Sequence, residues 1–171
     1  MNRAEKEVML RVDQAGEYGA KRIYAGQLAV LGDRHPMSAE IRHMAAQEEA
    51  HLTKFNALVA AHGVRPTLLQ PFWHVAGYVL GAATALIGPK AAMACTAAIE
   101  TEIDRHYSAQ LDALGEGDAE LAGVIREFRE DERAHHDAAL AAGAEQAPAY
   151  PLLSAAIRLG CRAAIRLSER I

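Results

Sequence analysis

The chain has 171 residues, carries a formal net charge of −4 at pH 7, and is 51% hydrophobic but only 5% aromatic. This length is enough for one domain with a sizeable core, and an alanine-rich chain with few runs of β-branched residues favours helices over strands. No glycine-rich nucleotide-binding motif follows a predicted strand, the N-terminus leads straight into a helical pattern rather than a signal peptide, and we expect no nucleic-acid partner. Cys95 and Cys161 lack the spacing of a metal site, so we expect reduced thiols.

Two helices are predicted in the first part of the chain. The first extends over about 4–31, ends before Gly32, and carries Glu17 on an otherwise apolar face. After a turn with Pro36, the second extends over about 38–62, and its apolar face carries Glu48 and His51. Both helices therefore direct carboxylates toward the core, where an unpaired charge is costly.

The next segment, residues 67–89, contains no Asp, Glu, Lys or Arg. It predicts a helix over about 71–87, close to the shortest length that spans a bilayer. Three alternatives remain open: a buried helix of the core, a helix lying on a membrane surface, and a membrane span. Gly77 and Gly81 form a pair of small residues that allows close helix approach and makes self-association plausible.

The rest of the chain predicts three more helices. Those over about 90–114 and 118–142 carry Glu100, and Glu132 with His135, on their apolar faces. The last, over about 152–170, has an arginine at every fourth position, opposite an apolar face: Arg158, Arg162, Arg166 and Arg170. A basic amphipathic helix suits an anionic membrane surface, and the alternative is a solvated arginine face on a packing helix.

One pattern occurs twice along the chain. Glu48 and His51, like Glu132 and His135, are three residues apart and share a helix face. A glutamate precedes each pair, Glu17 by 31 residues and Glu100 by 32. Four such helices predict an all-α, ferritin-like four-helix bundle that surrounds two metal ions, with the uncharged helix and the arginine helix added to it. Two divalent cations would balance the four carboxylates, and this donor set suits iron or manganese.

The internal symmetry also suggests how the ligands divide. Glu17 and His51 should serve one metal ion and Glu100 and His135 the other, while Glu48 and Glu132 are the expected bridges. Asp13 and Asp131 are candidate hydrogen-bond acceptors behind the ligand imidazoles. Glu49 and Glu102 point away from their ligand neighbours and are interpreted as surface residues or as outer neighbours of the site.

A di-iron site can activate dioxygen, but the fold class does not choose among hydroxylation, desaturation, radical generation, iron oxidation for storage and peroxide disposal. The uncharged segment and the arginine helix favour a lipid-like substrate at a membrane surface. The alternatives are a ferritin-like iron oxidase or store, and a non-catalytic scaffold on the membrane surface in which the metals only hold the bundle.

Many residues besides the ligands resemble the demethoxyubiquinone hydroxylase family over nearly the whole chain. The matching stretches are residues 13–20, 22–27, 47–48, 51–52, 54–56, 65–67, 93–96, 132, 135–137, 147–150 and 167–170. The resemblance implies a di-iron monooxygenase that uses dioxygen to hydroxylate the ring of demethoxyubiquinol in ubiquinone synthesis, with the same six ligands.

The resemblance also implies the reaction's other participants. His106 and Tyr107 match a His-Tyr pair that the family links to electron transfer between substrate and iron, and NADH is the expected electron donor. The implied partners are a polyprenyl quinol, the membrane surface, further copies of the chain and other proteins of ubiquinone synthesis. The implied location is the cytoplasmic face of a bacterial cell membrane, as a peripheral protein.

Overall fold

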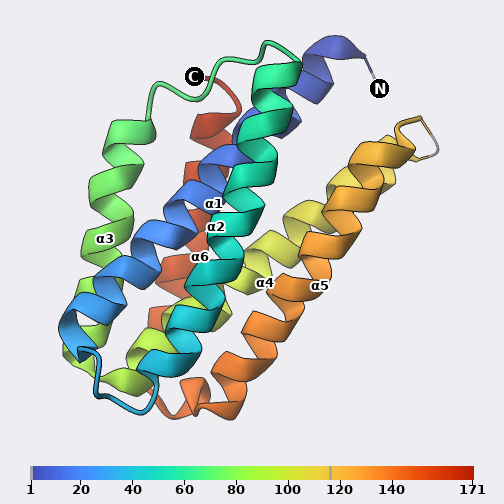
Figure 1. The fold of residues 1–171 in the computed structure, drawn as a ribbon. Coiled ribbons are helices and arrows are strands. Elements are labelled where there is room, and N and C mark those ends of the chain that lie inside the picture. Colours follow the sequence, from blue (N-terminus) through green and yellow to red (C-terminus); the bar gives the residue numbers. More distant parts are fainter. Residues whose placement is uncertain (1, 116) are drawn as a thin grey trace.

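A computed structural model describes residues 2–115 and 117–171, and these residues form six α-helices and one short 3₁₀ helix, without a strand (Figure 1). The predicted all-α fold is therefore confirmed. The elements are α1 (Arg3–Leu31), α2 (Ser38–Ala61), α3 (Gln70–Ile87), α4 (Pro89–Leu114), α5 (Ala119–Ala141), η1 (Ala144–Gln146) and α6 (Tyr150–Ser168).

Local signals in the sequence account for the helix ends. The Asn2 side chain accepts a hydrogen bond from the Glu5 amide at 3.0 Å and caps α1, while Asp118 accepts from the Leu121 amide at 3.1 Å and caps α5. Gly32 follows α1 with a φ of +70°, and Gly143 follows α5 with a φ of +88°. Glycine tolerates this left-handed backbone, so the chain can turn sharply there.

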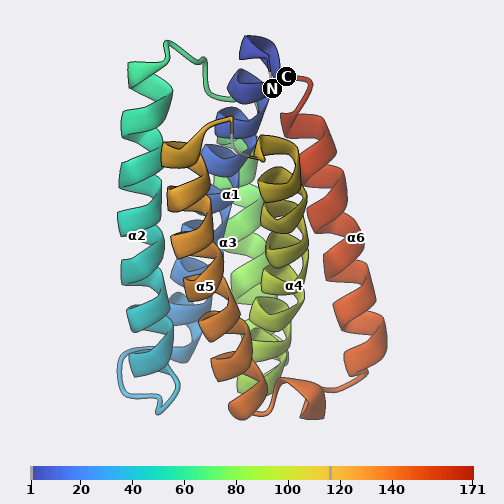
Figure 2. The same cartoon turned by 90° about the vertical axis from the view of Figure 1, so that its right-hand side faces the viewer.

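The bundle consists of two helix pairs, α1 with α2 and α4 with α5 (Figure 2). One core cluster contains Tyr24, Met44, Met93 and Ala139, and another contains Leu10, Phe55, Tyr107 and Phe128. On each of the four helices, the predicted metal ligands lie between these two sets of residues. Apolar packing on both sides thus encloses the carboxylates in the middle of the bundle.

Helices α3 and α6 lie outside the bundle, α3 against α1 and α6 against α4 (Figures 1 and 2). Glycines bring α3 and α1 together: a Cβ atom at Gly81 would lie 2.0 Å from the carbonyl oxygen of Ile23, and one at Gly77 would lie 2.9 Å from that of Gly19. The glycine pair therefore serves packing within the chain. Its predicted use in self-association is wrong, because α1 already covers it.

The surface of α3 decides among the alternatives for this segment. Only Gly81, Thr84 and Ala85 are buried in α3, and several large apolar side chains are 55–75% exposed: Phe72, Val75, Val79, Leu86 and Ile87. A buried core helix is therefore excluded. Within the described residues, no helix combines the length and apolarity that a bilayer crossing requires.

The arginine stripe of α6 is directed differently from the prediction. Arg158 Nε donates to Glu102 Oε1, and Arg162 Nε donates to Glu102 Oε2, each at 2.7 Å. Glu102 is only 2% exposed, so its interpretation as a surface residue is also wrong. Hydrogen bonds from the two arginines lower its pKa to about 2 against the opposing effect of burial. Half of the stripe therefore holds α6 on α4 instead of facing a membrane.

Candidate metal centre

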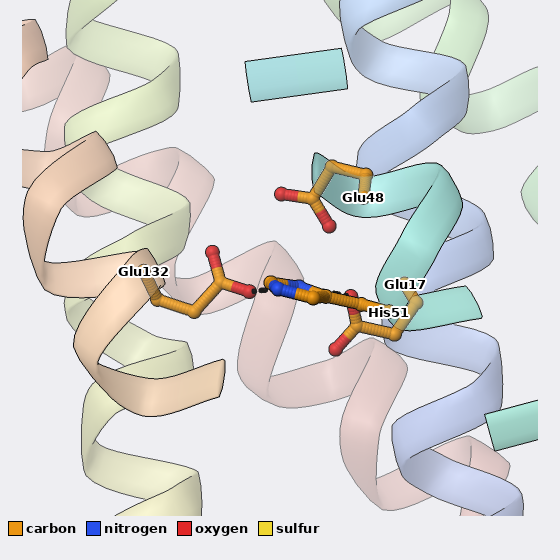
Figure 3. A group of neighbouring side chains, drawn as sticks. All are labelled: Glu17, Glu48, His51 and Glu132. Atoms are coloured by element: carbon orange, nitrogen blue, oxygen red, sulfur yellow. Dashed lines mark ion pairs between the residues drawn. The ribbon is translucent and has the colours of Figure 1, made fainter. Parts of the chain in front are cut away.

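The structure brings all six predicted ligands together in two overlapping groups. One group contains Glu17, Glu48, His51 and Glu132 (Figure 3), and the other contains Glu48, Glu100, Glu132 and His135. Within each group the candidate ligand atoms all lie within 4.8 Å of one another. The groups share Glu48 and Glu132, which is the arrangement that two bridging carboxylates require.

Both imidazoles direct Nδ1 into this cluster. His51 Nδ1 lies 3.3 Å from Glu17 Oε2 and 3.2 Å from Glu132 Oε1, and its ring lies between these two carboxylates in Figure 3. His135 Nδ1 lies 3.4 Å from Glu48 Oε1 and 3.0 Å from Glu132 Oε2. The same nitrogen of each ring is thus available to a metal ion.

The outer nitrogen of each ring has a partner. His51 Nε2 lies 3.0 Å from Asp131 Oδ2, and His135 Nε2 lies 3.0 Å from Gln47 Oε1. Donation from Nε2 to these oxygens leaves the Nδ1 lone pair for a metal and fixes the ring orientation. The contact predicted for Asp131 is therefore present, whereas sequence reasoning missed Gln47, which directly precedes Glu48.

Asp13 has a different neighbour from the one predicted. Its Oδ1 accepts a hydrogen bond from Gln110 Nε2 at 2.7 Å and lies 3.3 Å from His106 Nε2. Asp13 is one turn before Glu17, so it faces a later turn of α4 and does not reach a ligand imidazole.

Tyrosines hold two of the outer carboxylates. Tyr24 Oη donates to Glu100 Oε1 at 3.0 Å, and Tyr107 Oη donates to Glu17 Oε1. Tyr107 therefore borders the centre, while the adjacent His106 ring is directed toward Asp13 and remains partly exposed. Sequence reasoning missed Tyr24 as a site residue, although it lies two turns after Glu17 on the same stripe.

Burial of like charges dominates the electrostatics. Burial, and then the neighbouring carboxylates, raise the pKa values of Glu48 and Glu100 well above their ordinary range. Burial opposes a charged His51, but its close contacts with the carboxylates of Glu132 and Glu17 raise its pKa to about 10. Burial likewise opposes a charged Glu132, and its close contacts with the imidazoles of His135 and His51 nevertheless lower its pKa to about 2. The metal-free centre thus retains protons that cations would displace.

These residues fit two divalent cations. Both Oε atoms of Glu48, Oε2 of Glu17 and Nδ1 of His51 are buried without a hydrogen-bond partner. Unpartnered buried polar atoms are rare because each costs free energy. Oxygen and imidazole donors without a thiolate suit iron or manganese better than structural zinc.

A cavity of about 550 Å³ lies on the side of α1 and α4 that α3 and α6 cover. Its walls come from α1, α3, α4 and α6 and are almost entirely apolar. Small residues form much of the lining, including Gly16, Gly19, Ala76, Ala156 and Gly160. Two large side chains of α4, Ile99 and Ile103, also line it.

The family model described as "Ubiquinone biosynthesis protein COQ7" matches residues 4–168. The chain belongs to this family. A relative from Rhodospirillum rubrum, named 3-demethoxyubiquinol 3-hydroxylase, is 59% identical over 95% of this chain and 76% of its own length. The human mitochondrial protein named NADPH-dependent 3-demethoxyubiquinone 3-hydroxylase is 51% identical over 100% of this chain and 80% of its own length. A yeast relative, 5-demethoxyubiquinone hydroxylase from Saccharomyces cerevisiae, is 42% identical over 95% of this chain and 77% of its own length. The resemblance inferred from the sequence motifs is thus confirmed.

Proposed function

We propose that this protein hydroxylates the ring of demethoxyubiquinol in ubiquinone biosynthesis, with dioxygen as co-substrate and two iron ions as cofactor. The names of the COQ7-family relatives support the reaction. The observation that carries the proposal is the set of six metal-ligating side chains, each at most 4% exposed, with orphaned oxygen and nitrogen atoms directed at one another.

In this proposal Glu17 and His51 would hold one iron ion, Glu100 and His135 would hold the other, and Glu48 and Glu132, which belong to both groups, would serve both. The iron pair would supply electrons to dioxygen, so that one oxygen atom enters the ring and the other leaves as water. The chain's own contribution is to exclude water by burial and to orient the ligands, with Tyr107 holding Glu17 and Tyr24 holding Glu100.

The polyprenyl tail is the occupant that we propose for the apolar cavity. A tail of this kind offers only hydrocarbon, which the lining of α1, α3, α4 and α6 matches. The cavity touches Gly16 and Ile99, the immediate neighbours of Glu17 and Glu100. A tail bound there would therefore bring its ring to the two ligand-bearing helices.

Electrons and membrane contact complete the proposal. The reaction needs two electrons from outside, and a reduced nicotinamide nucleotide is the proposed source, since several mitochondrial relatives are named NADPH-dependent. Tyr107, which touches Glu17, and its neighbour His106 are the proposed route between substrate and iron. The exposed apolar residues of α3 and α6 would contact the cytoplasmic face of a bacterial membrane, where a quinol with a long tail resides.

An isotope experiment tests the reaction. Iron-loaded protein, a short-tailed demethoxyubiquinol and a reductant are mixed without oxygen, and oxygen-18 gas is then admitted. Mass spectrometry should detect product that carries one labelled oxygen atom. Oxygen uptake without labelled product would indicate an iron oxidase instead, and two bound irons without oxygen uptake would indicate a scaffold.

Variants connect that reaction to the site. Glu132→Gln keeps the side-chain volume but removes a carboxylate from both groups, so iron binding and labelled product should be lost. Glu49→Gln is the matched control, because Glu49 is exposed and pairs with Lys21 on the surface. Full activity of Glu132→Gln would contradict the ligand assignment.

A further inference from the structure

One apolar side chain, that of Ile103, contacts both the cavity and the core cluster of Tyr107, whose hydroxyl donates to the predicted ligand Glu17. Ile103 lies three residues after Glu100 and four before Tyr107, so the three share one face of α4. Ile103 lines the cavity and also packs against both the core cluster of Tyr107 and Phe128 and the cluster that contains Ile157. Ile103 is therefore part of the wall between the cavity and the core of the bundle.

A glycine of α1, Gly16, lies opposite Ile103 in this wall. Gly16 directly precedes Glu17 in α1 and lines the cavity, and a Cβ atom placed on it would lie 4.0 Å from Ile103 Cδ1. A glycine inside a helix is unfavourable relative to alanine. At Gly26 the backbone of α3 explains it, because a Cβ there would lie 2.1 Å from the Tyr78 carbonyl oxygen. Among the described residues outside its own stretch of α1, Gly16 has no such backbone contact, and the atom within 4 Å of its Cβ position ends a flexible side chain.

We propose that Ile103 and Gly16 form a gate through which the quinol ring passes from the cavity to the metal centre. The inference rests on the function proposed above. Glu17 directly follows Gly16, Ile103 packs against the cluster of Tyr107, and Tyr107 donates a hydrogen bond to Glu17. Rotation of the Ile103 side chain into the cavity breaks no hydrogen bond, and rotamer changes of this kind are fast compared with turnover. Ile103 is thus a positioning residue that admits the ring and closes the buried centre behind it.

Trp73 provides a readout that is independent of catalysis. It is the only tryptophan of the chain and it lines the cavity, so quenching of its fluorescence by a tailed quinone reports occupation of the cavity. Ile103→Phe enlarges one side of the gate and Gly16→Leu the other, and neither adds a tryptophan. In both variants kcat should fall about tenfold or more because the ring cannot pass, while the Kd from Trp73 quenching should change by a much smaller factor because the rest of the cavity lining is intact.

Controls separate the gate from general damage. Gly123→Leu makes the same change inside α5, where a Cβ atom would meet nothing within 4 Å, and should leave both kcat and Kd unchanged. The gate variants should still bind two iron ions and melt no lower than this control. Ile103→Ala opens the gate, so it should turn over quinols with bulkier ring substituents that wild type rejects.

The possible results test the gate and the proposed reaction separately. Wild-type kcat in Ile103→Phe and Gly16→Leu, with quinone bound, would overturn the gate. No Trp73 quenching in any variant or in wild type would remove the cavity as the substrate site and the gate with it. Labelled product from wild type under those conditions would leave the proposed reaction intact.

Discussion

Single residues in this protein are held by a few charge-assisted contacts, and Glu102 is the clearest case outside the metal centre. It lies two residues after Glu100 but on another face of α4, where Arg158 and Arg162 bind both of its oxygen atoms. Its pKa of about 2 is lower than the ordinary 4.5, because the arginines stabilise the carboxylate. A depressed carboxyl pKa stabilises the fold above the unfolded value and loses that effect as pH falls through the folded value.

Glu102→Gln should therefore destabilise the protein by about 1–3 kcal/mol at neutral pH, since charged hydrogen bonds are lost but the arginines regain water. The difference from wild type should shrink as pH falls from about 4.5 toward 2. Urea unfolding followed by circular dichroism at several pH values measures it. Arg166→Gln, at an exposed position of the same helix, is the control and should change stability by less than about 0.5 kcal/mol. A pH-independent difference would contradict the assignment.

Metal binding tests the protonation of single residues at the metal centre. Because the pKa values of Glu48 and Glu100 are raised well above normal and that of His51 to about 10, cations must displace protons at neutral pH. The affinity for Fe²⁺ should rise with pH, and calorimetry in buffers of different ionisation enthalpy should detect proton release. Glu48→Gln should release fewer protons and bind more weakly. Binding without proton release would show that the metal-free centre is already ionised.

Among the helices, α1 and α3 make the closest contact described, through Gly26, Gly77 and Gly81. This contact places the exposed apolar side chains of α3 outward and leaves a cavity between α1, α3, α4 and α6. Each of these glycines faces backbone atoms, which cannot move without separating the helices. By contrast, a Cβ atom added at Gly19 or Gly160, which also line the cavity, would meet nothing within 4 Å.

Gly81→Ala should consequently cost about 3 kcal/mol or more, because its Cβ would lie 2.0 Å from the Ile23 carbonyl oxygen. Gly160→Ala is the matched change in α6, where a Cβ would meet nothing within 4 Å, and it should be neutral or stabilising by up to about 1 kcal/mol. Thermal unfolding of both variants checks this. Equal stability of the two would mean that α3 can shift away from α1 at little cost.

At the scale of the whole molecule, the two added helices, α3 and α6, expose large apolar side chains on the outer surface. Val79 and Phe72 on α3, and Leu159 and Leu152 on α6, are 56–73% exposed. Since Arg158 and Arg162 are engaged with Glu102, the proposed membrane contact depends more on these apolar side chains than on a basic stripe. Exposed apolar surface of this extent marks an interaction site.

Val79→Glu combined with Leu159→Glu should weaken binding to phospholipid vesicles by about tenfold or more, because burying each side chain contributes about 1.5–3 kcal/mol. Co-sedimentation measures the partition coefficient. Ala57→Glu on the exposed side of α2 is the control and should bind like wild type. Arg166→Glu should weaken vesicle binding less than the double variant does. A larger loss of binding would indicate that the basic stripe is the main membrane contact.

The sequence alone was sufficient for the features that a single helix encodes. Helical periodicity placed Glu48 beside His51 and Glu132 beside His135, and glycines and caps marked where the helices end, because these depend only on neighbours a few residues apart. The repeated spacing then selected six side chains that the fold brings together.

Only the tertiary structure decided which surfaces meet. Periodicity shows that Arg158 and Arg162 share a face but not that Glu102 lies opposite, and it shows that Gly77 and Gly81 are aligned but not that α1 covers them. It likewise made Asp13 and Asp131 equal candidates behind the imidazoles, and only Asp131 contacts one. The cavity, with its wall at Gly16 and Ile103, comes from four helices at once, so its existence depends on packing between distant segments that no local pattern records.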